Sequence, residues 1–233
     1  MAPGLFVVAD GMGGHDGGDI ASAMAVEVFA AAAPTVADGG LPMDAVEHLL
    51  VEANSAIRRR AGAEFRSGMG TTVIGLVVAQ NGDGPSPLMF QVGDSRCYVL
   101  AAGALRQISH DHSEVQELVD SGELTPAEAR THPMRNVVTR ALGAEETVSA
   151  DYMVLGERDA RVLLCSDGLS GELTDEQISA VLNECPEPQR AADELVRLVL
   201  TGPAKDNVTV IVVDLTVTSI ADDDVTAPRE TVA

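Results

Sequence analysis

Short apolar runs alternate with longer amphipathic stretches along most of this chain. Runs of this kind, bounded by glycine or turn residues, are typical of buried strands. They predict strands at residues 5–9, 70–79, 88–92, 97–100, 105–108, 148–154, 161–165 and 208–213. Several are separated only by short turns, and strands joined in this way are antiparallel neighbours. This meander excludes a sheet built only from parallel strands and crossover helices.

Helical periodicity predicts the remaining elements. Residues 19–33 repeat apolar side chains one turn apart, and we expect Pro34 and the Gly39-Gly40 pair to end this helix. Further helices are expected at residues 44–61, 114–121, 126–130, 175–182 and 190–200. Helices and antiparallel strands in this order favour an α+β fold in which helices pack outside sheets.

Composition limits the size of the fold and its partners. The 233 residues suit one large domain, and with 3% aromatic residues and no tryptophan the core must be built from aliphatic side chains. The net charge of −21 repels phosphate backbones and anionic membranes, which excludes nucleic acid and membrane partners, but it attracts divalent cations. We expect a single domain over residues 1–215 and an acidic, disordered tail over residues 216–233.

The three cysteines, Cys97, Cys165 and Cys185, have no zinc-site spacing. The first two lie in apolar runs, where a reduced core thiol is expected, and this favours a reducing compartment. The sequence shows no signal peptide and no apolar run of membrane length. We therefore expect a soluble, cytoplasmic protein.

Carboxylates at strand boundaries are the candidate chemistry. Residues 7–9 lead into Asp10 and a glycine-dense turn, Asp167 follows another apolar run, and Asp206 precedes the last strand. One such aspartate is usually a turn former. Brought together, the three would supply oxygen ligands for one or two Mg²⁺ or Mn²⁺ ions, and such ions activate water at neutral pH. The spacing alone predicts metal-assisted hydrolysis.

A set of motifs in fixed order carries a more specific signal. The chain resembles the metal-dependent serine/threonine protein phosphatases of the PP2C or PPM family, and especially their bacterial branch. The motifs are Ala9-Asp10-Gly11-Met12-Gly13-Gly14-His15, Gly68-Met69-Gly70-Thr71-Thr72, Val92-Gly93-Asp94-Ser95-Arg96, Asp111-His112-Ser113, Val138-Thr139-Arg140-Ala141-Leu142-Gly143, Cys165-Ser166-Asp167-Gly168-Leu169 and Asp206-Asn207-Val208-Thr209.

The resemblance implies a fold and a metal site. The family fold is a four-layer αββα sandwich, in which two antiparallel sheets are flanked by helices. Asp10 would bridge two metal ions and Gly11 would contribute its carbonyl. Asp167 and Asp206 would bind the first ion, and Asp111 with Asp167 matches a third-metal position of bacterial members. The expected cofactor is Mn²⁺ or Mg²⁺, as two or three ions.

The resemblance also implies the reaction. A metal-bridging hydroxide would attack phosphoserine or phosphothreonine in line, with no phosphoenzyme intermediate. Phosphorylated serine/threonine proteins are the expected substrates, and a Ser/Thr kinase is a candidate partner. The irregular stretch from Asp111 to about Arg140 corresponds to the family's mobile flap beside the catalytic cleft.

Two roles remain open. Met12 stands where eukaryotic members carry a histidine proposed as general acid. His15 is the nearest substitute in sequence, and a solvent-exposed histidine at a helix start is an equal alternative. Asp94 and Arg96 are expected to be structural, as an ion pair or turn stabiliser.

The start of the chain departs from the family pattern. Members carry an upstream segment with a phosphate-binding arginine and an Asn-Glu-Asp run, whose Glu helps hold the second metal. The nine residues before Asp10 contain neither. We expect an N-terminally truncated active enzyme, because every downstream metal position is present. The alternative is a catalytically inactive phosphatase-fold protein that binds phosphoproteins or regulators; a two-metal nuclease is disfavoured by the acidic surface.

Overall fold

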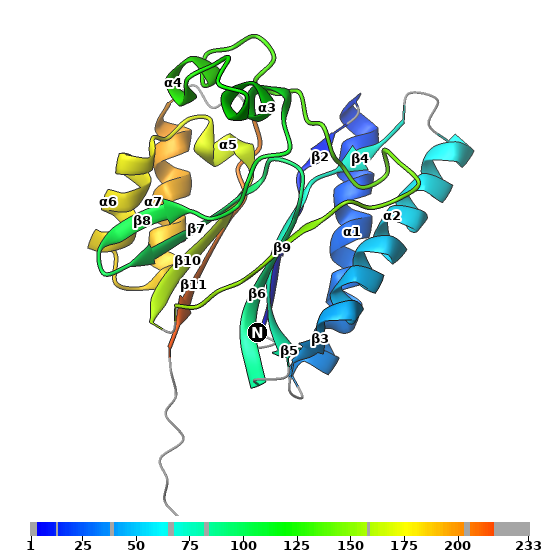
Figure 1. Cartoon of the computed structure of the whole chain (residues 1–233), viewed down its shortest axis with the longest axis horizontal. Coiled ribbons are helices and arrows are strands. Elements are labelled where there is room, and N and C mark those ends of the chain that lie inside the picture. Colours follow the sequence, from blue (N-terminus) through cyan, green and yellow to red (C-terminus); the bar gives the residue numbers. More distant parts are fainter. Residues whose placement is uncertain are drawn as a thin grey trace, which may run out of the picture.

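Four layers make up the protein (Figure 1). The computed structural model describes residues 4–12, 14–37, 40–64, 68–81, 84–157, 159–202 and 206–216. Helices α1 (Gly14–Ala37) and α2 (Met43–Glu64) cover one sheet, and α6 (Asp175–Glu184) and α7 (Pro188–Thr201) cover the other. The predicted α+β sandwich of two antiparallel sheets between helices is confirmed.

The first sheet has the strand order β1-β5-β6-β9, and its strands along this path are all antiparallel. The bounds are β1 (Leu5–Val8), β5 (Val73–Asn81), β6 (Gly84–Val92) and β9 (Asp151–Val154). The two-residue strand β3 (Leu41–Pro42) adds to β5 in parallel.

The second sheet has the order β11-β10-β7-β8 and is also antiparallel. Its strands are β7 (Arg96–Ala101), β8 (Ala104–Gln107), β10 (Ala160–Cys165) and β11 (Val210–Leu215). A separate two-residue ladder joins β2 (Gly11–Met12) to β4 (Gly70–Thr71). The short helices are α3 (Glu114–Asp120), α4 (Pro126–Ala129) and α5 (Asp167–Ser170).

Apolar cores fill each space between neighbouring layers. Between the first sheet and its helices, Phe29 of α1 stacks on Phe90 of β6 with ring centroids 5.2 Å apart. Phe90 faces Gly75 across the strands, and a Cβ on Gly75 would lie 2.1 Å from the ring. Glycine in this strand therefore makes room for the aromatic side chain that ties α1 to the sheet.

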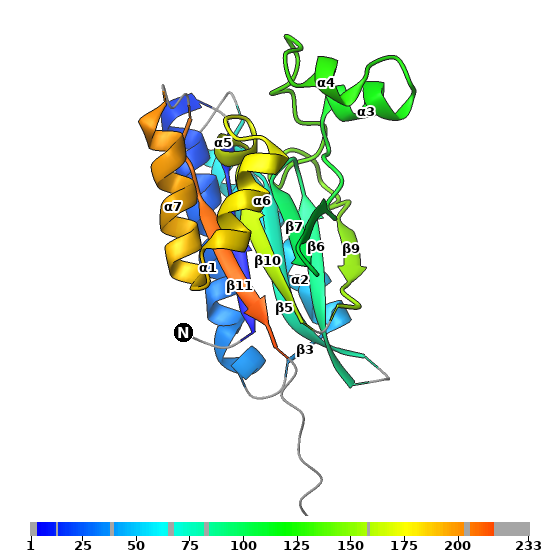
Figure 2. The same cartoon turned by 90° about the vertical axis from the view of Figure 1, so that its left-hand side faces the viewer.

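Helices α3 and α4 stand apart from the sandwich, beyond one end of its sheets (Figure 2). Their segment returns to its own start through backbone hydrogen bonds, from Thr139 N to His112 O at 2.8 Å and from Glu114 N to Val137 O at 3.0 Å. We call residues 110–140 the flap. The helices predicted at 114–121 and 126–130 are both found in it, as α3 and α4.

Some element boundaries differ from the prediction. Helix α1 begins at Gly14, inside the expected glycine turn, and continues past Pro34 to Ala37. A Cβ on Gly18 would lie 2.7 Å from the carbonyl of Gly11, so the glycines here permit close contact between helix and loop rather than a turn. Because α1 continues past Pro34, the expected end of the helix at this residue is wrong.

Strand β6 is longer than predicted and contains Pro85 and Pro87. It pairs with β9 only from Leu88 to Gln91. At the two prolines β6 is thus an edge strand, where a missing N–H is tolerated. The predicted tail lies outside the described residues apart from position 216.

One helix contradicts the expectation that no apolar run reaches membrane length. Residues Gly17–Val36 of α1 are long and apolar enough to cross a membrane by length and composition alone. In the fold Ala21, Ala25 and Phe29 of this helix are buried in the core beneath the first sheet. Only 22% of the stretch is buried, so α1 packs one side against the sheet as an outer layer of the sandwich.

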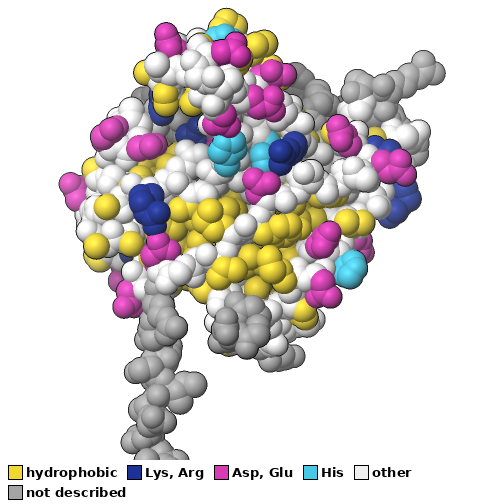
Figure 3. All heavy atoms as spheres, in the orientation of Figure 1, with side chains coloured by type: hydrophobic (Ala, Val, Ile, Leu, Met, Phe, Trp, Pro, Cys, Tyr) yellow, Lys and Arg dark blue, Asp and Glu magenta, His cyan; other side chains and the backbone are white. Residues whose placement is uncertain are grey.

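One face exposes apolar side chains (Figure 3). Met153 and Val154 of the edge strand β9 are 43% and 48% exposed. Acidic side chains are distributed around this apolar area and outnumber the basic ones in the same view.

Candidate metal centre

The backbone of Asp10 is fixed between β1 and β2 by the threonine pair. Thr72 N and Thr71 Oγ1 donate to Asp10 O at 2.8 and 2.9 Å, and Asp10 N donates to Thr72 Oγ1 at 3.1 Å. Thr72 Oγ1 also lies 2.7 Å from Ser95 Oγ, which follows Asp94. The Gly-Thr-Thr motif therefore joins two carboxylate-bearing loops.

Asp167 begins α5 directly after β10. Gly168 allows the segment of Asp206 to pass close by, because a Cβ on Gly168 would lie only 2.1 Å from Asn207 O. Ser166 Oγ donates to the same carbonyl at 3.4 Å. Two segments that are about forty residues apart in sequence are thus held together at the C-terminal end of β10.

The carboxyl groups of Asp10 and Asp167 lie close enough for each to affect the protonation of the other. Burial and then the charge of Asp167 raise the pKa of Asp10, and burial raises the pKa of Asp167. The charge of Asp206 acts on both in the same direction. Asp167 Oδ1 is buried and has no hydrogen-bond partner among the described residues. Buried polar atoms normally have partners, so this oxygen indicates a binding site.

Asp94 belongs to the same electrostatic group. Asp94 is buried, with 8% of its surface exposed. Burial, followed by the charges of Asp167 and Asp111, raises the pKa of Asp94 to about 7. The expected Asp94–Arg96 ion pair is not found, because Arg96 binds Asp111 instead. The sequence pattern had indicated an acid beside Gly93 at a strand boundary, but it could not show that this acid faces Asp167.

Asp111 is engaged by other side chains. Arg96 Nε and Nη2 donate to its Oδ2 at 2.9 and 2.6 Å, and Gln107 Nε2 donates to Oδ1 at 2.9 Å. Burial alone would lower the pKa of Arg96, but the Asp111 carboxylate raises it overall. Asp111 thus has its oxygens occupied, in contrast to Asp167.

His112 ties the flap to the loop of Asp94. Gly93 N donates to His112 Nδ1 at 3.1 Å, and His112 N donates to Gly93 O at 3.1 Å. Burial lowers the pKa of His112, which favours the neutral ring that can accept this bond. This bond and the burial of the ring give His112 a role in packing.

Gly11 and His15 are the two remaining residues of the predicted site. Gly11 pairs with Thr71 in the short β2–β4 ladder. The side chain of His15, the candidate general acid, lies outside the described side chains.

The donor set fits a hard divalent cation. Asp10, Asp94, Asp167 and Asp206 offer only carboxylate oxygens, which Mg²⁺ and Mn²⁺ accept. The raised pKa values of Asp10, Asp94 and Asp167 reflect burial and repulsion between carboxylates, both of which a cation would relieve. Among the described residues, no group of three or more acidic, histidine or cysteine side chains is already arranged to hold a metal ion. Asp206 is exposed, and its Oδ1 accepts from Asn207 N at 2.8 Å.

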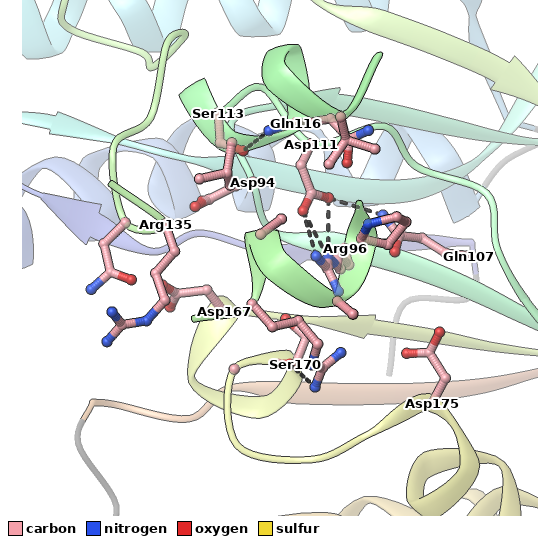
Figure 4. Close-up of a pocket in the computed structure, with 18 residues that line it drawn as sticks. Asp94, Arg96, Gln107, Asp111, Ser113, Gln116, Arg135, Asp167, Ser170 and Asp175 are labelled. Carbon is pink, nitrogen blue, oxygen red and sulfur yellow. Dashed lines mark hydrogen bonds and ion pairs between the residues drawn. The ribbon is translucent and has the colours of Figure 1, made fainter. Parts of the chain in front are cut away.

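A cavity of about 370 Å³ opens beside these carboxylates (Figure 4). The flap forms one wall and the start of α5 and α6 another. Its charged lining residues are Asp94, Arg96, Asp111, Arg130, Arg135, Asp167 and Asp175. A ligand in this cavity would contact both the flap and the candidate metal ligands.

Residues 2–199 match the model of the family described as Protein phosphatase 2C. The serine/threonine protein phosphatase PstP of Mycobacterium tuberculosis is 39% identical over 212 residues, which cover 91% of this chain and 40% of that protein. The chain thus spans well under half the length of this relative. The serine/threonine phosphatase stp of Listeria monocytogenes is 35% identical over 216 residues, covering 90% of this chain and 84% of that protein.

A solved structure carries metal. The catalytic domain of the serine/threonine protein phosphatase PstP, in complex with two manganese ions, superimposes with a TM-score of 0.78 at 37% identity. The match covers 91% of this chain and 88% of that one.

Proposed function

Because this chain belongs to the protein phosphatase 2C family, we propose that it hydrolyses phosphoserine and phosphothreonine esters of proteins with divalent cations held around Asp10. The observation that carries this proposal is the half-buried Asp10–Asp167 pair, in which the buried Oδ1 of Asp167 lacks a hydrogen-bond partner among the described residues. Its relatives PstP and stp are named serine/threonine phosphatases. No described residue favours the inactive alternative.

Each aspartate would have a role in metal binding that follows from its place in the fold. Asp10 and Asp167 would hold the cations from the ends of β1 and β10, and Asp206 and Asp94 would complete the negative site. Bound divalent cations make water a better nucleophile at neutral pH and offset the charge of the phosphate. The manganese-bound PstP structure supports Mn²⁺ as the ion, with Mg²⁺ as the alternative.

The finer assignments belong to the same proposal. Gly11 would contribute its carbonyl beside Asp10. Asp111 would bind a third ion only after Arg96 releases it, since both of its oxygens now accept hydrogen bonds. His15 would act as general acid. Substrates would be phosphoproteins, with a Ser/Thr kinase as partner and the cytoplasm as the compartment.

The surroundings of Asp10 and the flap would keep the site in place and separate it from bulk water. Asp10 is held by three backbone or threonine hydrogen bonds, so its carboxylate can stay in place while charge changes around it. The flap borders the cavity and would exclude water from the bound phosphate.

The test is hydrolysis of a phosphothreonine peptide with Mn²⁺ and with a chelator. We expect turnover only with Mn²⁺. Asp167→Asn keeps the shape of the side chain and should lower kcat by about 100-fold or more, the scale for removing an electrostatic group that acts in the transition state. The control Asp193→Asn removes an exposed charge from α7 and should change nothing. Equal turnover by Asp167→Asn would refute the assignment.

A further inference from the structure

The imidazole ring of His112 has polar neighbours from three different segments of the chain. Gly93 N donates to its Nδ1 at 3.1 Å. On the other side of the ring, Nε2 lies 3.4 Å from Asp151 Oδ2 of β9 and 3.2 Å from Arg140 Nη1 at the end of the flap. The His112 side chain is only 3% exposed, so these protein groups, rather than water, decide how the ring is hydrogen-bonded.

One tautomer of the ring cannot satisfy all of these neighbours. A neutral imidazole carries a single proton, so one of its nitrogens donates and the other accepts. Gly93 N and Arg140 Nη1 are both donors, and each needs an unprotonated nitrogen beside it. The ring therefore accepts from Gly93 N only when its proton is on Nε2, and from Arg140 only when its proton is on Nδ1. The partners of the two nitrogens thus determine the tautomer.

Asp151 supplies the group that selects between the two tautomers. A carboxylate offers only acceptor atoms, so Asp151 Oδ2 favours a proton on the Nε2 of His112. Its other oxygen, Oδ1, lies 3.3 Å from Arg140 Nη1 and gives this guanidinium group an alternative partner to the ring. Both contacts leave Nδ1 unprotonated for Gly93 N. Asp151 lies outside the described lining of the cavity, so any effect on the site passes through His112.

The bond to Gly93 bears on the candidate metal centre because Gly93 directly precedes Asp94. Gly93 has φ +105°, and a Cβ on it would lie 2.6 Å from the Thr72 side chain. His112 holds both polar backbone groups of this residue, since His112 N also donates to Gly93 O at 3.1 Å. We propose that Asp151 is a positioning residue, which holds His112 in the tautomer with its proton on Nε2 and thereby fixes the loop of Asp94. The link to metal binding rests on the proposed function.

Nitrogen NMR of the full chain with ¹⁵N-labelled histidine, without metal and at pH 8, locates the ring proton. Protonated and unprotonated imidazole nitrogens differ clearly in chemical shift, and couplings to the ring carbon protons distinguish Nδ1 from Nε2. The signals of His112 are those that disappear in His112→Asn. We expect the proton on Nε2 in the unaltered protein.

Removing the carboxylate should move this proton to Nδ1. In Asp151→Ala the guanidinium of Arg140 is the stronger of the two remaining donors, because its hydrogen bond is charge-assisted. Asp151→Val, which suits a strand, carries the same expectation if the alanine variant does not fold. Adding Arg140→Met to either variant removes the competing donor and should return the proton to Nε2. The control Glu146→Ala removes an exposed acid shortly before β9 and should leave the tautomer unchanged.

Calorimetric titration with Mn²⁺ measures the consequence for the candidate metal centre. Asp151→Ala should bind Mn²⁺ about 10-fold more weakly, at the lower end of the range for residues that orient a metal site from outside the coordination shell. Arg140→Met in the same chain should recover most of this loss, and Glu146→Ala should bind normally.

Two results would overturn the proposal: an unchanged tautomer in Asp151→Ala and Asp151→Val, or a changed tautomer with unaltered Mn²⁺ affinity. Failure of the proposed function has a different signature. In that case the unaltered protein would not hydrolyse a phosphothreonine peptide with Mn²⁺, while the proton of His112 would still move in Asp151→Ala.

Discussion

Removing the charge of Asp94 should stabilise the metal-free protein at alkaline pH. Burial and the neighbouring carboxylates raise the pKa of Asp94 from its ordinary 3.8 to about 7. The folded protein therefore keeps a proton that the unfolded chain releases, so stability falls as the pH rises from about 4 to 7 and stays low above that. Asp94→Asn cannot ionise and escapes this loss.

The size of the effect follows from the same shift. Each pKa unit corresponds to about 1.4 kcal/mol, so the ionised Asp94 costs the fold about 4 kcal/mol at pH 8. Asp10 and Asp167 act in the same direction and remain in both proteins. Because the charge of Asp94 also raises the pKa of Asp10, its removal lessens the cost of ionising Asp10 as well, which adds to the stabilisation of the variant.

Urea denaturation in the presence of a chelator measures the difference. At pH 8 the free energy of unfolding of Asp94→Asn should exceed that of the unaltered protein by up to about 4 kcal/mol, and the gap should be much smaller at pH 4.5. The control Asp193→Asn, an exposed site, should show no such gap at either pH. A variant that is no more stable at pH 8, or equally more stable at both pH values, would contradict the electrostatic account of this site.

Two further substitutions test how the loops are held. Thr72→Val keeps the shape but loses the acceptor for Asp10 N and the contact with Ser95 Oγ; unfolding should become easier by about 1–3 kcal/mol, and Mn²⁺ affinity measured by calorimetry should fall. Stability and affinity that both match the unaltered protein would show that these bonds do not position Asp10. Gly168→Ala should displace the segment at Asn207, which a Cβ would approach to 2.1 Å, and should lower both the melting temperature and Mn²⁺-dependent turnover. Unchanged melting would mean that this approach is not required.

Much of the architecture could be predicted from hydrophobic periodicity. The strands of the meander and the helices α2, α6 and α7 lie where the pattern placed them, because their buried faces repeat at the period of the element. The first turn of α1 could not be recognised from the sequence, because its glycines weaken the helical pattern. Glycine is needed at position 18, since this residue lies too close to Gly11 for a Cβ. The one-turn helix α5 has too few residues to show a period.

The candidate site was predictable in part. Asp10 and Asp167 were expected to meet because each ends an apolar strand, and the charge of Asp167 raises the pKa of Asp10. The partner of Arg96 was not predictable: Asp111 lies fifteen residues away, beyond β8, and the pair forms only once the second sheet and the flap are in place. Asp94 was placed at a strand boundary by the sequence, but its orientation toward Asp167 depends on the packing of the two sheets.

The central claim is that Asp10 and Asp167 jointly hold divalent cations. Anomalous diffraction at the manganese absorption edge, from crystals grown with Mn²⁺, locates the ions directly. The account predicts a peak between the Asp10 and Asp167 carboxylates, with Asp167 Oδ1 as a ligand. A peak confined to Asp111, or none beside Asp10, would contradict it.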